Sequence, residues 1–391
     1  MTTQAIAINA AARQRYLFVL LSLGFVMTGL EITLLGPLLP QFIARWSLND
    51  SQIGLFFPVE FGCSLAGVWL ASLLTHYFGT RVPVLAGYFL MAVGLATVNA
   101  SSMTVALVAL AALGLAYGLV VPGTNLTVAE IAGERSASLV SLVNFAWSAG
   151  AVSCSPLVLL ALRRQLLPEM LYTAAAFTLV LTFFFLFTEF PVPSHKTSSL
   201  SGPAPAVGAA ITMALATLFF LYVSVEVSLG SWAAAHVKRI VGSGEGWSTV
   251  APMFFYGGLM LGRVSAPLIL RRIREYRLVL SMLLVVLVAS TAVILAKNRP
   301  TAFIGLTFAG LGCATVFPIY VSWLSRWYGR SANRVSGLMF SMSSVGSAVG
   351  PWLVGEVSTH AGGLRAGLGV PLAAVAGMLV LLLLVRRQAA A

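Results

Sequence analysis

The chain has 391 residues, of which 59% are hydrophobic and 9% are charged, and its formal net charge is +12. A soluble domain of this length cannot bury that much apolar surface. Apolar runs long enough to cross a bilayer recur along the whole chain, which indicates a multi-span membrane protein. Because the basic charge is better explained by orientation in the membrane, we expect no nucleic-acid partner.

The apolar runs predict an all-α membrane protein with twelve transmembrane helices, because they do not alternate polar and apolar residues as barrel strands do. The predicted spans are residues 16–43, 52–76, 81–99, 103–128, 137–161, 168–189, 208–236, 248–270, 277–296, 300–324, 334–357 and 366–385. The three cysteines (Cys63, Cys154 and Cys313) fall within spans, where free buried thiols are expected.

A long polar stretch separates the sixth span from the seventh. Residues 191–207 are rich in Pro, Ser and Gly and lack an apolar period, which predicts a cytoplasmic linker. It would join an N-terminal six-helix bundle (residues 1–190) to a C-terminal one (residues 208–391). With a cytoplasmic N-terminus, most of the 23 Lys and Arg residues lie on the cytoplasmic side. We therefore expect a monomer in the inner membrane of the cell, with both termini in the cytoplasm.

The two predicted halves are similar to each other in sequence. At an offset of 195 residues, Glu31 coincides with Glu226, Gly62 with Gly257, Gly67 with Gly262, and Pro156 with Pro351. One of these coincidences joins two acids that are rare inside spans. Duplication of a six-helix unit is therefore expected, with two pseudo-symmetric bundles and a substrate site between them near the midplane.

Several stretches resemble the major facilitator superfamily. "GLEITLLGPLLPQF" in the first span and "GCSLAGVWLASLLTHYFGTR" in the second resemble the start of such a transporter. "YVSVEVSLGSW", "GGLMLGR" and "SLVNFAWSAGAVSCSP" are similar to spans 7, 8 and 5 of the fucose–galactose–glucose:proton symporter branch. The resemblance covers nearly the whole chain and implies transport by alternating access.

The sequence departs from this family in two places. The loop after the second span normally carries an acid, where this chain has His76, and Arg81 is the remaining base. Glu130 is placed to pair with Arg81, or both are solvated at helix ends. Fucose permeases are expected to carry an acid a few residues before an Asn in span 4. Aligned on Asn125, that position is Val121, so the role of that acid is not transferred.

The acids within the spans are the candidates for ion coupling. Glu31 and Glu226 lie near the middle of spans 1 and 7, which line the central cavity in the family that this chain resembles. A carboxylate at that depth usually faces a partner or a water-filled cavity. We expect Glu226 and Glu31 to couple transport to H+ or Na+. The alternative is a protonated side chain that only hydrogen-bonds a neighbouring helix.

Four further charged residues are candidates for the cavity or its gates. They are Glu60 in span 2, Arg263 in span 8, and the pair Glu130 and Arg81. For Glu60 a buried hydrogen-bonding role is the alternative. For Arg263 the alternative is packing, pairing with carbonyl groups or snorkelling to the interface.

Neutral polar and aromatic residues along the central spans are the candidates for substrate binding: Asn125, Asn144, Trp147, Tyr222 and Trp232. Amides both donate and accept hydrogen bonds, which suits sugar hydroxyls, and aromatic faces suit the C–H face of a pyranose. Because Lys and Arg are missing from the middle of these spans, the substrate is expected to be neutral. Packing or interfacial anchoring is the alternative for Trp147 and Trp232.

Nothing in the sequence indicates an enzyme or a bound cofactor. The four His residues are scattered over loops and span ends, so no metal or nucleophile–base cluster is predicted. The glycine-rich stretches "GLGC" and "GSGEG" do not follow a strand, so no nucleotide loop is expected. The sequence favours a secondary-active symporter of a neutral sugar or sugar-like solute. The alternatives are a proton-driven exporter of drugs or amphiphiles, and a membrane sensor or chaperone with the same fold.

Overall fold

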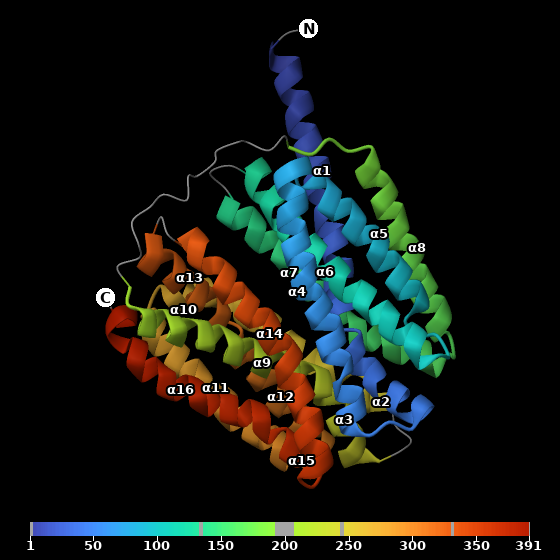
Figure 1. Ribbon diagram of the computed structural model, residues 1–391, viewed down its shortest axis with the longest axis vertical. Helices are drawn as coiled ribbons and strands as arrows, with labels where there is room; N and C mark the ends of the chain where they lie inside the picture. Colours follow the sequence, from blue (N-terminus) through green and yellow to red (C-terminus); the bar gives the residue numbers. More distant parts are fainter. Residues whose placement is uncertain (1–2, 133–135, 192–206, 243–245, 330–331, 391) are drawn as a thin grey trace. The chain divides into compact units, whose positions relative to one another are not determined.

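The computed structural model describes residues 3–132, 136–191, 207–242, 246–329 and 332–390, and within them every regular element is helical (Figure 1). The first eight helices are α1 (Thr3–Ile32), α2 (Leu35–Trp46), α3 (Asp50–Gly54), α4 (Phe56–Phe78), α5 (Arg81–Thr97), α6 (Met103–Ala132), α7 (Ser136–Arg163) and α8 (Leu167–Leu186). The others are α9 (Ala209–Val241), η2 (Gly246–Ser248), α10 (Ala251–Leu270), α11 (Glu275–Leu295), α12 (Arg299–Cys313), α13 (Val316–Tyr328), α14 (Ala332–His360), α15 (Leu364–Gly367) and α16 (Gly369–Ala390).

The helices account for all twelve predicted spans. Ten segments in the described chain are long and apolar enough to cross a membrane. The two other predicted spans are occupied by α5, which has 17 residues, and by α10, which has 20 residues. Most of the predicted linker, residues 192–206, lies outside the described residues.

Two predicted spans are each divided in their interior into two helices of at least 12 residues, where the sequence predicted a single helix. The first span breaks at Thr33–Leu34, between α1 and α2, and the tenth breaks at Ala314–Thr315, between α12 and α13. In each case a proline, Pro37 or Pro318, lies four residues after the first residue of the break. A proline ring collides with the carbonyl group four residues earlier in a helix, but it fits the first turn of a new helix. The two breaks therefore place each proline in the first turn of its helix.

The chain forms two units by its internal contacts. One unit comprises Met1–Leu34 and Gly62–His195, and the other comprises Leu35–Phe61 and Lys196–Ala391. The segment Leu35–Phe61, which holds α2, α3 and the start of α4, thus groups with the later part of the chain. The reason is that α2 packs against α9, and α3 packs against α14.

The same pairs of helices pack together in both units, as duplication predicts. In the first unit α1 packs against α7, and α5 against both α6 and α8. The counterparts in the second unit are α9 with α14, and α11 with both α12 and α16. Two glycines that coincide at the 195-residue offset serve the same purpose: a Cβ at Gly67 would strike the carbonyl of Leu115, and one at Gly262 would lie 2.9 Å from that of Leu311. Both glycines therefore allow close helix packing.

Candidate functional site

Glu226 lies on α9 and faces a cation on α10. Its Oε1 atom is 4.0 Å from Nη2 of Arg263, and the side chains are 14% and 29% exposed. An opposite charge at this distance stabilises an ionised carboxylate in surroundings where it would otherwise be unfavourable. The structure thus brings together two residues that the sequence analysis considered separately.

Tyr222 is one helical turn before Glu226 and belongs to the same cluster. Its ring is 1% exposed, and its hydroxyl donates a hydrogen bond to the backbone carbonyl of Cys313, with 3.1 Å between the oxygens. Glu226 lies within electrostatic reach of both the Tyr222 hydroxyl and the Cys313 thiol. The predicted coupling residue therefore has a charged neighbour on α10 and polar neighbours on its own helix, α9, and on α12.

Trp232 lies six residues after Glu226 on α9 and is fully buried. Its ring nitrogen donates a 2.9 Å hydrogen bond to the carbonyl of Pro351 on α14, and its ring lies 6.1 Å from that of Phe57. These contacts explain the position of Trp232 by packing between helices. A contact between Trp232 and a substrate stays a prediction.

In the first unit, the two predicted amides meet directly. Nδ2 of Asn144 on α7 donates a 2.9 Å hydrogen bond to Oδ1 of Asn125 on α6. Each Nδ2 also donates to the backbone carbonyl four residues earlier, at 2.8 Å from Asn144 to Val140 and 2.9 Å from Asn125 to Val121. Within the described chain no donor reaches Oδ1 of Asn144. The pair therefore still has hydrogen-bonding capacity for a ligand.

Trp147 follows Asn144 by three residues and lies on the same side of α7. Its side chain is half-buried. Its backbone carbonyl lies so close to Gly29 of α1 that any Cβ at Gly29 would overlap it. The glycine thus sets the close packing of α1 on α7 beside the amide pair.

Glu31 is fully buried in the last turn of α1, directly before the break in the first span. Its backbone carbonyl accepts the hydrogen bond of Leu34 that closes the turn, at 3.0 Å. Its side chain lies within electrostatic reach of Cys154 on α7. Interrupted helices are where secondary transporters typically form their ion sites.

Glu60 is 1% exposed in α4, and its Oε2 atom has no hydrogen-bond partner among the described residues. Buried carboxylates without partners are rare, because an unsatisfied polar atom costs about 1–3 kcal/mol. Glu60 is therefore not explained as a structural hydrogen-bonding residue by the contacts of the described chain. Its role in a cavity or gate stays a prediction.

Arg81 and Glu130 do not form an ion pair in the described chain. Nη2 of Arg81 instead donates a 2.5 Å hydrogen bond to the backbone carbonyl of Leu186, at the end of α8. Both side chains are exposed. This arrangement agrees with the alternative in which both groups are solvated at helix ends.

A third group of polar residues was missed by the sequence analysis. Asp50, the first residue of α3, is 8% exposed. Its carboxylate accepts hydrogen bonds from both Nη1 and Nη2 of Arg239 on α9, with 2.8 Å between Nη1 and Oδ2. The Ser358 hydroxyl on α14 donates to the same carboxylate. We call these three residues the Asp50 cluster. Only folding brings them together, since they lie more than 100 residues apart, and the local sequence carries no signal for it.

Neighbouring contacts strengthen the docking of α3 on α14. The backbone N–H of Ser51 donates a 2.8 Å hydrogen bond to the Thr359 hydroxyl, and the Ser51 hydroxyl donates to Oε1 of Glu356. Gly355 allows the two backbones to meet, because a Cβ at this position would overlap the carbonyl oxygen of Asp50. Hydrogen bonds from several side chains thus join α3 to α14.

Comparison with known proteins settles the family. The family model described as "Major Facilitator Superfamily" matches residues 21–298. The chain belongs to the major facilitator superfamily. It is therefore a multi-pass membrane transporter rather than an enzyme, and the predicted twelve-helix fold in two six-helix halves is confirmed.

Two curated relatives are similar in sequence. An uncharacterized MFS-type transporter of Yersinia pestis is 24% identical over 339 residues, which cover 86% of this chain and 87% of that protein. A putative glucose/galactose transporter of Helicobacter pylori is 28% identical over 141 residues, but these cover only 36% of this chain and 34% of that protein.

Two solved structures confirm the fold. A bacterial homolog of the human lysosomal transporter Spinster, in an inward-facing and unoccupied conformation, has a TM-score of 0.78 at 15% identity, covering 96% of this chain and 97% of the other. FucP in the outward conformation has a TM-score of 0.65 at 18% identity, covering 94% and 98%. The predicted resemblance to the fucose–galactose–glucose branch is supported by the partial match to the putative glucose/galactose transporter, whereas the two solved structures show the fold alone.

Proposed function

We propose that this major facilitator transporter couples uptake of a neutral sugar or sugar-like solute to a cation, with Glu226 as the coupling residue. The observation that carries the proposal is the contact of Glu226 with Arg263 at 4.0 Å. An opposite charge favours the ionised carboxylate, whereas apolar surroundings favour the protonated one. A movement that separates α9 from α10 at this point would therefore favour proton uptake by Glu226, and its reversal would favour release.

The substrate class is proposed from the first unit. The hydrogen-bonded amides of Asn125 and Asn144 offer a donor and an acceptor without a charge, which suits a hydroxyl-rich solute. A fucose:proton symporter among the structural neighbours and the partial match to a putative glucose/galactose transporter agree with this class. A sodium ion held by the carboxylate is the alternative coupling ion.

The test is solute uptake by proteoliposomes under an imposed pH gradient or an imposed sodium gradient, with a panel of labelled neutral sugars. The wild-type protein should accumulate at least one sugar in the direction of the ion gradient. Glu226→Gln should abolish accumulation but retain exchange of solute across the membrane, because glutamine mimics the protonated side chain permanently. Glu169→Gln, the same change at an exposed residue in the first turn of α8, is the matched control and should behave as the wild type.

Two outcomes would contradict the proposal. Accumulation by Glu226→Gln at the wild-type level would remove this residue from coupling. Movement of amphiphilic solutes against the proton flux, without sugar uptake, would make the protein an exporter.

A further inference from the structure

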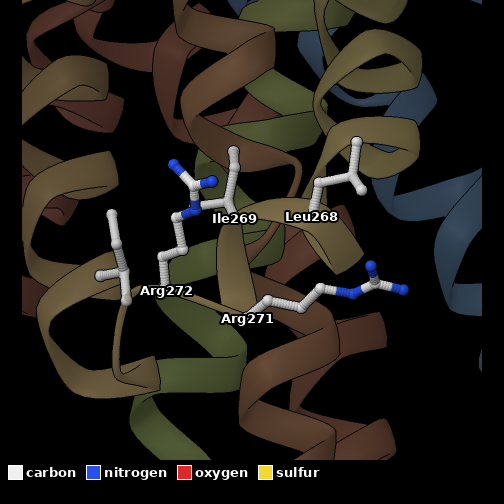
Figure 2. Close-up of a pocket in the computed structure, with 5 residues that line it drawn as sticks. Leu268, Ile269, Arg271 and Arg272 are labelled. Atoms are coloured by element: carbon white, nitrogen blue, oxygen red, sulfur yellow. The ribbon is translucent and has the colours of Figure 1, made fainter.

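The turn between α10 and α11 forms a basic pocket that the transport function does not explain. The pocket has a volume of about 430 Å³ and is lined by Leu268, Ile269, Arg271, Arg272 and Ile273. Figure 2 shows the guanidinium group of Arg272 beside the side chain of Ile269, whereas the Arg271 side chain extends to the other side of the turn, on the side of Leu268. Cationic and apolar groups thus line the same hollow at the end of α10.

Within the described part of the chain, no acid neutralises the charge of this turn. Arg271, Arg272, Arg274 and Arg277 are all exposed, and none of them forms an ion pair with a residue of the described chain. The nearest acid in the sequence, Glu275, is already engaged: its Oε2 accepts 2.8 Å and 2.5 Å hydrogen bonds from Trp323 and Arg326. Four guanidinium groups within seven residues therefore remain available to an external anion.

An apolar stripe on α10 leads from the bilayer to this turn. Leu261, Val264 and Leu268 follow each other at intervals of three and four residues, so they share one helix face. Their side chains are 58%, 59% and 64% exposed. The rise from Leu261 to Arg271 is about 15 Å at 1.5 Å per residue, which is half of a hydrocarbon core of about 30 Å. An acyl chain of one leaflet matches this length.

We infer that this turn binds the headgroup of an anionic phospholipid, with the phosphate against Arg271 and Arg272 and an acyl chain along Leu261, Val264 and Leu268. Guanidinium groups bind phosphate oxygens through paired hydrogen bonds, and basic clusters beside a membrane helix attract anionic lipids. The stripe distinguishes a lipid from a free phosphate, which would use only the arginines. The proposed site uses neither Glu226 nor the Asn125–Asn144 pair, so its test does not depend on the transported solute.

The experiment counts lipids bound to the purified full-length protein by native mass spectrometry. The protein is titrated with dioleoylphosphatidylglycerol, with dioleoylphosphatidylcholine, or with inorganic phosphate at the same ionic strength. Phosphatidylglycerol should bind more tightly than phosphatidylcholine and should be weakened by salt. Arg271→Gln/Arg272→Gln should lower the phosphatidylglycerol affinity by about 25-fold, taking about five-fold for each arginine. The single variants, which remove half of this charge, should each show about five-fold loss.

The matched control is Arg163→Gln/Arg164→Gln, which removes the same charge from two adjacent exposed arginines at the end of α7. It should retain wild-type binding. Equal loss in the control would show a general effect of charge and overturn the site. Equal affinity for both lipids, wild-type binding by the Arg271/Arg272 variants, or competition by inorganic phosphate at the concentration of the lipid would overturn it as well.

Discussion

The Asp50 cluster makes a prediction about what holds α3 against the second unit. Asp50 has a side chain that is only 10% exposed, whereas that of Arg239 is 41% exposed. Removing the arginine therefore leaves a buried carboxylate with the Ser358 hydroxyl as its remaining side-chain partner, while removing the acid leaves an arginine that reaches water. We expect Arg239→Gln to destabilise the folded protein more than Asp50→Asn.

The magnitude follows from the two exposures. Breaking a fully buried ion pair by removing one partner costs about 3–5 kcal/mol, and exposed pairs contribute about 0–1 kcal/mol. Arg239 is two-fifths exposed, so Arg239→Gln should lower the free energy of unfolding by roughly 2–3 kcal/mol. Asp50→Asn keeps an acceptor for the guanidinium and should cost only about 1 kcal/mol.

The assay is unfolding of the purified variants in a denaturing-detergent titration, followed by tryptophan fluorescence. Arg13→Gln is the control, because Arg13 and Glu189 form an ion pair with side chains that are 66% and 75% exposed, and its loss should change little. If Arg239→Gln is no less stable than Arg13→Gln, or if Asp50→Asn is the more damaging change, the argument from burial is refuted.

Three other changes test the remaining residues. Asn144→Ala should weaken substrate binding by about 1–3 kcal/mol in an equilibrium binding assay, because it leaves a polar group of the substrate without a hydrogen-bond partner. The variant should stay folded, and wild-type affinity would mean that Asn144 has only a packing role. Glu31→Gln should shift the pH optimum of transport with less effect on exchange, and an unchanged pH profile with unchanged affinity would leave Glu31 as a buried structural residue. Gly67→Ala should lower the melting temperature because its Cβ has no room against α6, whereas Gly62→Ala, with nothing within 4 Å, should be tolerated; similar melting of the two variants would contradict the packing argument.

The sequence was sufficient for the helices because hydrophobic length alone decides which segments can cross a bilayer. The breaks after Ile32 and after Cys313 were not predicted, although Pro37 and Pro318 mark them. Other prolines, such as Pro122 and Pro156, lie inside continuous helices, so a proline alone does not decide between a break and a bend.

The candidate site was predictable where residue type alone carries information. Uncommon acids and amides in apolar spans made Glu226, Asn125 and Asn144 candidates, and the structure places the two amides in contact. The partner of Glu226 was harder to predict, because nothing in the local sequence of α10 tells whether Arg263 reaches α9 or the interface. The Asp50 cluster could not be predicted from the sequence, because its hydrogen bonds depend on how α3, α9 and α14 pack together.

The grouping of Leu35–Phe61 with the second unit has a consequence for divided chains. If the chain were divided within residues 191–207, neither of the two polypeptides would contain all the helices of the second unit. The second would lack α2 and α3, leaving uncovered the surfaces of α9 and α14 that they pack against, and with them the guanidinium of Arg239 and the hydroxyl of Ser358. The first fragment would carry α2 and α3 without the surfaces of α9 and α14 against which they pack. Docking of α2 and α3 onto these surfaces would therefore drive recombination of the two fragments.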